Sequence, residues 1–300
     1  MKIKTKEIVK IYDQKLPTEL IALDKVNVEI NQGEFIAIIG QTGSGKTTFI
    51  QHMNALLLPD KGEIEYFYID SENNEKKLVV KKPKFFRSKL KFVNEIRRRV
   101  GVVFQFAEYQ LFEQTIEKDI IFGAVSMGTS KSEAKKKATE MIELVGLDQS
   151  FLQKSPFELS GGQKRRVAIA GILAMNPDII FFDEPTAGLD PQGTIKMLEI
   201  LDTLNKMGKT IILATHDLDS VLEWTKRCIF FKDGKIIYDG ETYPILANNK
   251  FLVENNMLPT NLLNFREKLI KIGYPISDVK SIAELITEIN AIIEKEKNAN

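Results

Sequence analysis

The chain has 300 residues, 43% of them hydrophobic and 28% charged, so it is long enough to bury one large core or two moderate ones. No apolar stretch approaches the roughly 20 residues of a membrane-spanning helix, and the N-terminus lacks the apolar run of a signal peptide. A net charge of +1 argues against a nucleic-acid-binding surface spread over the whole protein. Cys228 is the only cysteine, which excludes an intrachain disulfide and favours a reducing cytosol. We therefore expect a soluble globular protein, with Cys228 buried beside Ile229.

The first 30 residues predict an antiparallel layer. Polar and apolar residues alternate from Ile3 to Ile11 and again from Val26 to Ile30, as they do in half-buried strands. Tyr12 follows the first of these strands, and its ring could stack on an adenine base. Ordinary packing of that tyrosine explains the sequence equally well.

Residues 40–47, called the phosphate loop below, read Gly-Gln-Thr-Gly-Ser-Gly-Lys-Thr and fit the pattern Gly-x-x-x-x-Gly-Lys-[Ser/Thr]. The loop lies between an apolar strand over Phe35–Ile39 and a helix formed by the residues after Thr47. Its glycines let successive backbone N–H groups point at phosphate oxygens, and the helix start adds the positive end of its dipole. A flexible Gly/Ser loop is the alternative, and the strand-to-helix context disfavours it. The residues expected to bind a nucleotide here are Gly40, Gln41, Thr42, Gly43, Ser44, Gly45, Lys46, Thr47 and Thr48.

Two side chains of the phosphate loop have more specific expected roles. Lys46 would neutralise phosphate oxygens, and the hydroxyl of Thr47 would bind Mg²⁺, which takes few protein ligands beside phosphates and water. His52 falls inside the following helix, where we expect a structural or surface role.

A basic stretch follows the next predicted strand, Glu63–Ile69. Between Asp70 and Arg99 there are eleven Lys and Arg residues against four acidic ones, which leaves the rest of the chain net acidic. We favour a solvated excursion from a surface hairpin. The alternative is attraction to an anionic membrane surface, worth ~1 kcal/mol per basic residue.

The middle of the chain predicts another buried strand and an amphipathic helix. The apolar strand Val100–Phe104 is followed by Gln105, and sites in parallel sheets are built at such strand ends. Apolar residues lie on one face of a predicted helix over Lys131–Leu147. Ser130 and Glu133 predict a capping box at its start, and Gly146 would end it.

Residues 159–163 read Leu-Ser-Gly-Gly-Gln and precede a predicted helix over Lys164–Ala174. Ser160 and the free N–H groups of Gly161, Gly162 and Gln163 would form a second anion-binding helix start. Taken alone, an ordinary Ser/Gly helix cap is the better explanation of this motif.

Two later buried strands also end in polar residues. Ile179–Phe182 runs into Asp183 and Glu184, and two acids at such a position are costly unless they serve a cation or a proton. Asp183 would hold Mg²⁺ through water, and Glu184 would polarise the attacking water; an acidic surface turn is the alternative. The strand Thr210–Ala214 places His216 where it could contact a γ-phosphate.

In composition, order and spacing, these motifs over residues 1–240 resemble those of the ATP-binding-cassette ATPases. The resemblance implies an α/β P-loop NTPase core in which a mixed sheet is joined by an antiparallel β layer and an α-helical subdomain. It implies ATP and Mg²⁺ as cofactors and ATP hydrolysis coupled to translocation. Residues 159–163, the signature segment, would close over ATP held by the phosphate loop of a second subunit. The roles carried over are catalytic for Glu184, His216 and Gln105, metal-binding for Thr47, Gln105 and Asp183, and nucleotide-binding for the phosphate loop, Thr48, Tyr12, Ser160, Gly161, Gly162 and Gln163.

Three segments are similar to the energy-coupling factor branch, and within it to the second member of the ATPase pair: Phe104–Glu113, Arg165–Pro177 and Pro185–Gly193. This resemblance implies a subunit that powers uptake of vitamins or metal ions. It also implies a second cassette ATPase as partner, as a heterodimer or else a homodimer, together with a transmembrane scaffold and substrate-capture membrane subunits. The chain would be peripheral to the cell membrane on its cytoplasmic side, with no nucleic acid as partner.

The expected division is an ATPase domain over 1–240, with a helical subdomain at about 106–175, and a C-terminal helical extension over 241–300 used for ATPase pairing. In the extension, Ser281–Glu284 can cap a helix with an apolar stripe formed by Ile282, Leu285, Ile286, Ile289, Ile292 and Ile293. The basic stretch departs from the branch. The alternatives are an ATPase of another ABC transporter type and a soluble ABC ATPase acting on nucleic acid or the ribosome. A simple P-loop kinase has no use for the signature segment.

Overall fold

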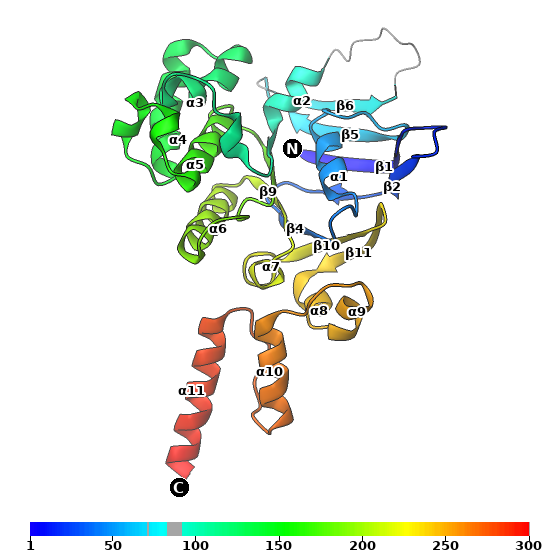
Figure 1. Ribbon diagram of the computed structural model, residues 1–300, viewed down its shortest axis with the longest axis vertical. Coiled ribbons are helices and arrows are strands. Elements are labelled where there is room, and N and C mark those ends of the chain that lie inside the picture. The colour runs from blue at the N-terminus through cyan, green and yellow to red at the C-terminus, as the bar shows by residue number, and fades with distance from the viewer. Residues whose placement is uncertain (71, 83–91, 300) are drawn as a thin grey trace.

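The computed structural model describes residues 1–70, 72–82 and 92–299, with side chains up to residue 295. Four basic residues of the stretch between 70 and 99 lie outside the described residues: Lys84, Arg87, Lys89 and Lys91. Two sheets organise the chain, one antiparallel and one mostly parallel (Figure 1). This matches the expected mixed α/β architecture with an antiparallel layer.

The antiparallel sheet has the order β2-β1-β5-β6, and β3 also pairs with β1. Its strands are β1 (Lys2–Tyr12), β2 (Leu20–Val26), β3 (Glu29–Ile30), β5 (Lys61–Ile69) and β6 (Glu75–Lys81). The expectation of one strand from Val26 to Ile30 is wrong, because the chain breaks between β2 and β3. The hydroxyl of Thr5 accepts the Val28 N–H at 2.8 Å and donates to the Val26 carbonyl at 3.2 Å, so a side chain replaces the ladder at the break.

The second sheet has the order β11-β10-β4-β9-β8-β7, parallel except for the β10–β11 pair. Its strands are β4 (Phe35–Ile39), β7 (Val100–Val103), β8 (Ile179–Asp183), β9 (Thr210–Ala214), β10 (Arg227–Lys232) and β11 (Lys235–Glu241). Every residue of β4, β7, β8 and β9 is buried, which explains their continuous apolar runs. The carboxyl ends of these four strands therefore gather the phosphate loop, Gln105, Glu184 and His216 at one edge.

Helix α1 (Lys46–Met53) packs between the two sheets. Phe49 lies between Phe181 of β8 and Phe231 of β10, and all three rings are buried. His52 is fully buried and its Nδ1 lies 2.7 Å from the Thr48 carbonyl, so the expected structural role is confirmed. Cys228 in β10 is also buried, as expected, and burial raises the pKa of its thiol to about 12.

A group of helices covers the other face of the parallel sheet (Figure 1): α3 (Ile116–Ser126), α4 (Lys131–Leu144), α5 (Gly161–Leu173) and α6 (Pro191–Lys206). Helix α4 ends three residues before the expected Leu147, and Gly146 follows with a φ of +72°. Its capping box is only half formed. Ser130 accepts the Glu133 N–H, but the Glu133 carboxylate pairs with Lys137 one turn further on.

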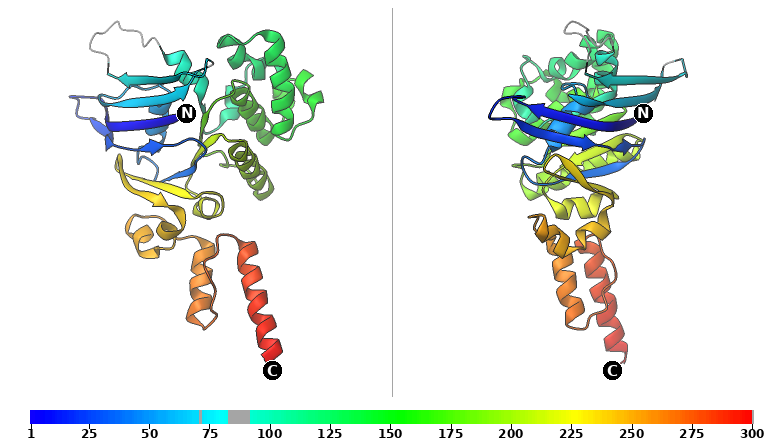
Figure 2. Two further views of the ribbon diagram at one scale, coloured as in Figure 1. Left: turned by 180° about the vertical axis from the view of Figure 1, so that it is seen from behind. Right: turned by 90° about the vertical axis from the view of Figure 1, so that its right-hand side faces the viewer.

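The remaining helices are α2 (Val93–Arg99), α7 (Leu218–Trp224), α8 (Thr242–Leu246), α9 (Asn249–Glu254), α10 (Asn261–Lys271) and α11 (Ile282–Ala299). Helices α8 and α9 share a core with β4 and β10. Helices α10 and α11 project away from the sheets, and buried leucines from the first turns of both helices join the same core (Figures 1 and 2). Ser281 accepts the Glu284 N–H at the start of α11, as expected, while the Glu284 carboxylate accepts the N–H of Lys280. Across the described ranges, no helix combines the length and apolarity needed to cross a membrane.

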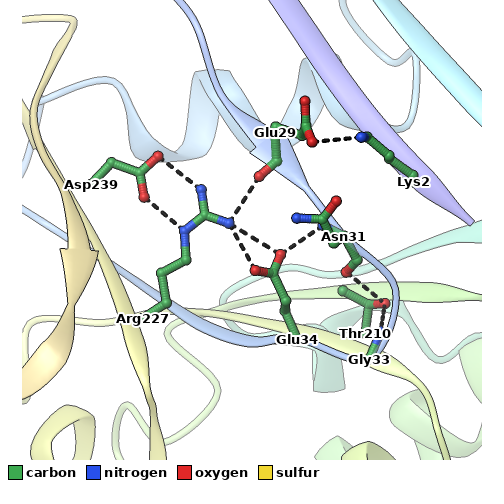
Figure 3. Close-up of polar contacts among 8 residues, drawn as sticks. All are labelled: Lys2, Glu29, Asn31, Gly33, Glu34, Thr210, Arg227 and Asp239. Carbon is green, nitrogen blue, oxygen red and sulfur yellow. Dashed lines mark hydrogen bonds and ion pairs between the residues drawn. The ribbon is translucent and has the colours of Figure 1, made fainter.

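Arg227 joins the two sheets at the amino ends of the parallel strands (Figure 3). Its guanidinium donates to both oxygens of Asp239 at 2.7 and 2.8 Å, to Glu34 at 3.0 and 3.1 Å and to the Glu29 carbonyl at 2.9 Å. Glu29 in turn pairs with Lys2 of β1. The sheets are thus tied together at the edge opposite the phosphate loop.

Glu65 predicts how the stability of the antiparallel sheet depends on pH. Its side chain is 5% exposed and accepts from Lys6 at 2.6 Å and Lys77 at 2.7 Å, and these bonds lower its pKa from 4.5 to about 2. A carboxylate with a lowered pKa stabilises the fold above its unfolded pKa and loses that contribution as the pH falls. Glu65→Gln should therefore reduce the dependence of the free energy of unfolding on pH between about 4.5 and 2.

Urea unfolding at several pH values measures this dependence. Glu63→Gln is the matched control, because Glu63 is on the same strand but is 31% exposed and lies 3.4 Å from Lys6. Equal pH slopes for Glu65→Gln and the unsubstituted chain would contradict the prediction.

Candidate active site

The backbone of the phosphate loop has the conformation that the spacing of its glycines predicts. Gly40, Gly43 and Gly45 have φ values of +142°, +82° and +106°, a region that side chains with a Cβ rarely adopt. A Cβ at Gly40 would lie 2.2 Å from the Phe231 carbonyl oxygen, and one at Gly45 would lie 2.6 Å from that of Ala22. The loop is therefore pressed against β10 and β2, and neither glycine can be replaced without moving backbone.

The polar groups of the loop fit an anionic ligand. Lys46 is buried and donates to the carbonyls of Gly40 at 2.6 Å and Gln41 at 2.9 Å. Burial lowers the pKa of Lys46, and the nearby charges of Glu184 and Asp183 oppose that shift. The buried Ser44 hydroxyl has no hydrogen-bond partner among the described residues. An unpaired buried hydroxyl is costly, so a lysine and a free hydroxyl within a glycine cradle suit phosphate oxygens.

Thr47 and Asp183 come together at the start of α1 and the end of β8. The Thr47 hydroxyl donates to the Asp183 carboxylate at 2.8 Å. Asp183 is 5% exposed, and burial raises the pKa of its carboxyl, with Glu184 adding to the rise and the Thr47 bond opposing it. A hydroxyl and a carboxylate side by side are the hard oxygen donors that Mg²⁺ prefers.

Glu184 and His216 form a second polar pair across the ends of β8 and β9. Glu184 has a φ of +50°, uncommon for a residue with a side chain, and its N–H donates to the Ala214 carbonyl at 2.8 Å. Its carboxylate lies 2.9 Å from His216 Nδ1 and accepts from the Thr215 hydroxyl at 3.3 Å. The carboxylate of Glu184 is thus held on both sides. Thr215 was missed in the sequence, although its position at the end of β9 was a usable signal.

A cavity of about 240 Å³ brings most of the predicted residues together. Gln105 and Tyr12 line it with Asp183 and Glu184, so the ends of β1, β7 and β8 meet the loop. Leu20 and Ala22 of β2 also line it, which the sequence gave no reason to expect. Gln41 points elsewhere, because its side chain donates to the Asn256 carbonyl at 3.0 Å. The phosphate-loop residues on the cavity wall are Thr42, Gly43, Gly45, Lys46 and Thr47, and Thr48 of α1 also lines it.

The signature segment lies on a different cavity of about 360 Å³, shared with Leu189 and Asp190. Ser160 accepts the Gln163 N–H at 3.3 Å, and the Gln163 side chain accepts the Ser160 N–H at 3.0 Å, which completes a capping box at the start of α5. The two cavities have no lining residue in common. Within one chain, the signature segment and the phosphate loop therefore line separate cavities.

Comparison with known proteins extends this description. Residues 23–187 match the family model described as "ABC transporter". The chain is 87% identical over 300 residues, the full length of both chains, to the energy-coupling factor transporter ATP-binding protein EcfA2 of Mesomycoplasma hyopneumoniae (strain J). Its identity to the protein of the same name from Enterococcus faecalis is 42% over 291 residues, 96% of each chain.

Solved structures agree with these relatives. The chain is similar to cbiO1 from Clostridium perfringens, part of the ABC transporter complex cbiONQ, at a TM-score of 0.68 and 33% identity, covering 88% of this chain and 98% of that one. It is also similar to the ATP-binding cassette MJ0796 in a dimeric post-hydrolysis state bound to ADP and Pi, at a TM-score of 0.65 and 32% identity, covering 80% of this chain and 98% of that one. The chain therefore belongs to the ABC transporter ATPase family and, within it, to the ATP-binding proteins of energy-coupling factor transporters.

Proposed function

We propose that this chain is the ATP-hydrolysing subunit of an energy-coupling factor importer, peripheral to the cytoplasmic side of the cell membrane, with Mg²⁺ as cofactor. The observation that carries the proposal is the cavity in which the phosphate loop meets the Thr47–Asp183 pair and Glu184, whose carboxylate also lies 2.9 Å from His216 outside the cavity lining. Vitamins or metal ions would be the cargo, chosen by separate substrate-capture membrane subunits.

The chain's own residues divide the chemistry between them. Lys46 and the loop N–H groups hold the phosphates, and Tyr12 lies where it can stack on the adenine. Thr47, Asp183 and Gln105 would hold Mg²⁺, which neutralises charge on the transferred phosphoryl group. Glu184 orients the attacking water and accepts its proton, and His216 and Thr215 fix the Glu184 carboxylate. Such fixed charges supply most of the catalysis in phosphoryl transfer.

A complete site would need a second cassette ATPase. Ser160, Gly161, Gly162 and Gln163 stand at a helix start away from the chain's own phosphate loop, so they are available to the nucleotide of another subunit. The dimeric form of MJ0796 supports a paired arrangement. We propose a different cassette chain as the partner, with a second copy of this chain as the alternative.

Contact with the transmembrane scaffold is proposed at the segment after Gln105. Tyr109 and Phe112 are 83% and 58% exposed, and the Phe112 ring packs edge-on against the exposed ring of Phe122. Large exposed aromatic side chains that gather in one region mark interaction sites. This surface would pass motion between the scaffold and the ATP site. The cbiONQ complex, which contains a similar chain, supports membrane partners of this kind.

We further propose the division into an ATPase domain over 1–240, including the helical subdomain at 106–175, and a pairing extension over 241–300. On α11, Leu285 is buried while Ile282 and Ile286 are 69% and 53% exposed, which leaves apolar surface for a partner.

We propose that the described part of the basic stretch is solvated, with β6 forming a surface hairpin with β5. Three of its described lysines, Lys76, Lys77 and Lys82, pair with Asp70, Glu65 and Asp60 of the same sheet region. Pairs of this kind leave less positive charge for a polyanion, so no nucleic-acid partner is proposed.

Thr47→Val should weaken the use of Mg²⁺, because it removes the hydroxyl beside Asp183 while keeping the shape of the side chain. We expect the Mg²⁺ concentration for half-maximal hydrolysis to rise ~10-fold, equivalent to ~1.4 kcal/mol. The control is ATP binding measured in EDTA. Its Kd should change by less than about twofold, a change in binding free energy below ~0.5 kcal/mol. An unchanged Mg²⁺ requirement would remove Thr47 from the metal site.

Glu184→Gln should leave ATP binding intact and lower kcat by ~10² or more, because the amide keeps the size of the side chain but cannot accept a proton. Hydrolysis in the purified complex and ATP affinity of the variant chain provide the two measurements. Near-normal hydrolysis would exclude Glu184 as the base.

Ser160→Arg should block hydrolysis by the complex without weakening the ATP affinity of the isolated chain, because Ser160 lines a cavity apart from the phosphate loop. Ser132→Arg, on the exposed face of α4, is a control for the added charge. A large loss of ATP binding by the isolated Ser160→Arg chain would contradict the paired arrangement.

A further inference from the structure

Arg165 makes hydrogen bonds that the mechanism above does not use. It lies on α5, two residues after the signature segment, and its side chain is 4% exposed. Nε and Nη2 donate to the two carboxylate oxygens of Glu108 at 3.0 and 2.8 Å. Nη1 donates to the carbonyl oxygens of Pro185 at 2.9 Å and Ala187 at 2.6 Å. One guanidinium group therefore has four bonds to two other segments.

Each of the connected segments carries part of the site. Glu108 is in a short 3-10 helix, Ala107–Gln110, three residues after Gln105. Pro185 and Ala187 follow Glu184 directly and lead to Asp190, which lines the cavity of the signature segment. Arg165 thus joins the Gln105 segment, the start of α5 and the loop after Glu184 at a single point.

The chemistry of these bonds favours fixed geometry. A buried charge is costly unless it is paired and fully hydrogen-bonded, and the planar guanidinium matches a carboxylate with two parallel bonds. Burial alone would raise the pKa of Glu108, but the hydrogen bonds and charge of Arg165, together with a backbone hydrogen bond, lower that pKa. Lysine, which presents a single ammonium group, cannot bind the carboxylate as a fork and also reach both carbonyls.

The Glu108 end of this connection is next to an exposed surface. Tyr109 is 83% exposed and Phe106 is 44% exposed, and their rings lie 6.1 Å apart. A partner that displaced these rings would move Glu108, and the bonds of Arg165 would carry that displacement to the helix start and to the loop after Glu184.

We propose that Arg165 is a positioning residue that, through Glu108 and the carbonyls of Pro185 and Ala187, makes the Gln105 segment, the signature segment and the loop after Glu184 move as one unit. The inference rests on the proposed function in one respect, namely that a membrane partner acts on the aromatic rings beside Glu108. Arg165 touches neither the phosphate loop nor the wall of the nucleotide cavity. Its loss should therefore affect turnover rather than nucleotide binding.

The test uses the complex that a tagged copy of this chain brings from detergent-solubilised membranes. We compare Arg165→Gln, Arg165→Lys and Glu108→Gln with the unsubstituted chain, and we measure kcat and KM for ATP hydrolysis. We expect at least a tenfold fall in kcat for Arg165→Gln and Glu108→Gln, an intermediate fall for Arg165→Lys, and KM within twofold. Glu108→Gln keeps the test open if Arg165→Gln does not fold, because it conserves size at a partly exposed position.

A double-mutant comparison tests whether the two side chains act together. If Arg165 works through Glu108, adding Glu108→Gln to Arg165→Gln should change kcat less than twofold further. If the double variant instead loses a hundredfold or more in kcat, the two effects multiply. That result would contradict the proposal that Arg165 and Glu108 act as one unit. An unchanged kcat for Arg165→Lys would contradict the need for a guanidinium that donates two parallel hydrogen bonds to the Glu108 carboxylate.

Arg227→Gln is the matched structural control, because Arg227 also bonds a carboxylate as a fork and a backbone carbonyl, but at the opposite edge of the sheet (Figure 3). It should lower the thermal unfolding midpoint and leave kcat within twofold. An equal fall in kcat for Arg227→Gln and Arg165→Gln would show that lost stability explains both, and would overturn the proposal. Because kcat is measured on any complex the chain forms, failure of that complex to import a substrate would contradict the proposed function alone.

Discussion

The hydrogen bond from Thr47 to Asp183 joins the two halves of the nucleotide site. Thr47 begins the helix that follows the phosphate loop, and Asp183 ends the central strand β8, so a 2.8 Å contact sets the loop against the sheet. Burying the Asp183 carboxylate is costly, and the Thr47 hydroxyl offsets part of that cost; the proposed Mg²⁺ would offset more of it. The fully apolar strand before Asp183 and the glycines before Thr47 are the structural conditions for this contact.

The common direction of the strands in the parallel sheet then determines which polar groups lie close together. Strands β4, β7, β8 and β9 run in one direction, so their polar end residues gather at one edge while Arg227 and Glu34 tie the opposite edge. The signature segment begins a helix on the covering layer and is therefore set apart from the loop. Under the proposed function, each chain carries two half-sites, and pairing with a second cassette chain would complete them.

The sequence predicted the local parts of this arrangement well. Three local patterns each favour one low-energy structure: four large apolar residues before Asp183, the glycine spacing around Lys46 and the serine before Gly161. The structure has a buried strand, a positive-φ glycine loop and a helix cap at these positions. The break between Val26 and Ile30 was not predictable, because it depends on Thr5, more than 20 residues away in the chain.

Contacts between segments that are far apart in the chain could not be predicted from the sequence. Arg165 was included only as part of a predicted helix and of a segment similar to the energy-coupling factor branch, since nothing local reveals that its charge is buried against Glu108, 57 positions earlier. Thr215 was passed over beside the more conspicuous His216. The half-formed capping box at Ser130 has a related cause, because Glu133 had a second partner available in Lys137.

The most direct test of the paired half-sites is a photo-crosslink from the signature cavity. Gln192 is exposed on that cavity and can be replaced by a benzophenone amino acid in the membrane-derived complex, with ATP present. The account predicts a covalent adduct of two cassette chains, joined at a peptide that contains the phosphate loop of the second chain. An adduct confined to one chain, joining Gln192 to its own residues 40–47, would contradict it.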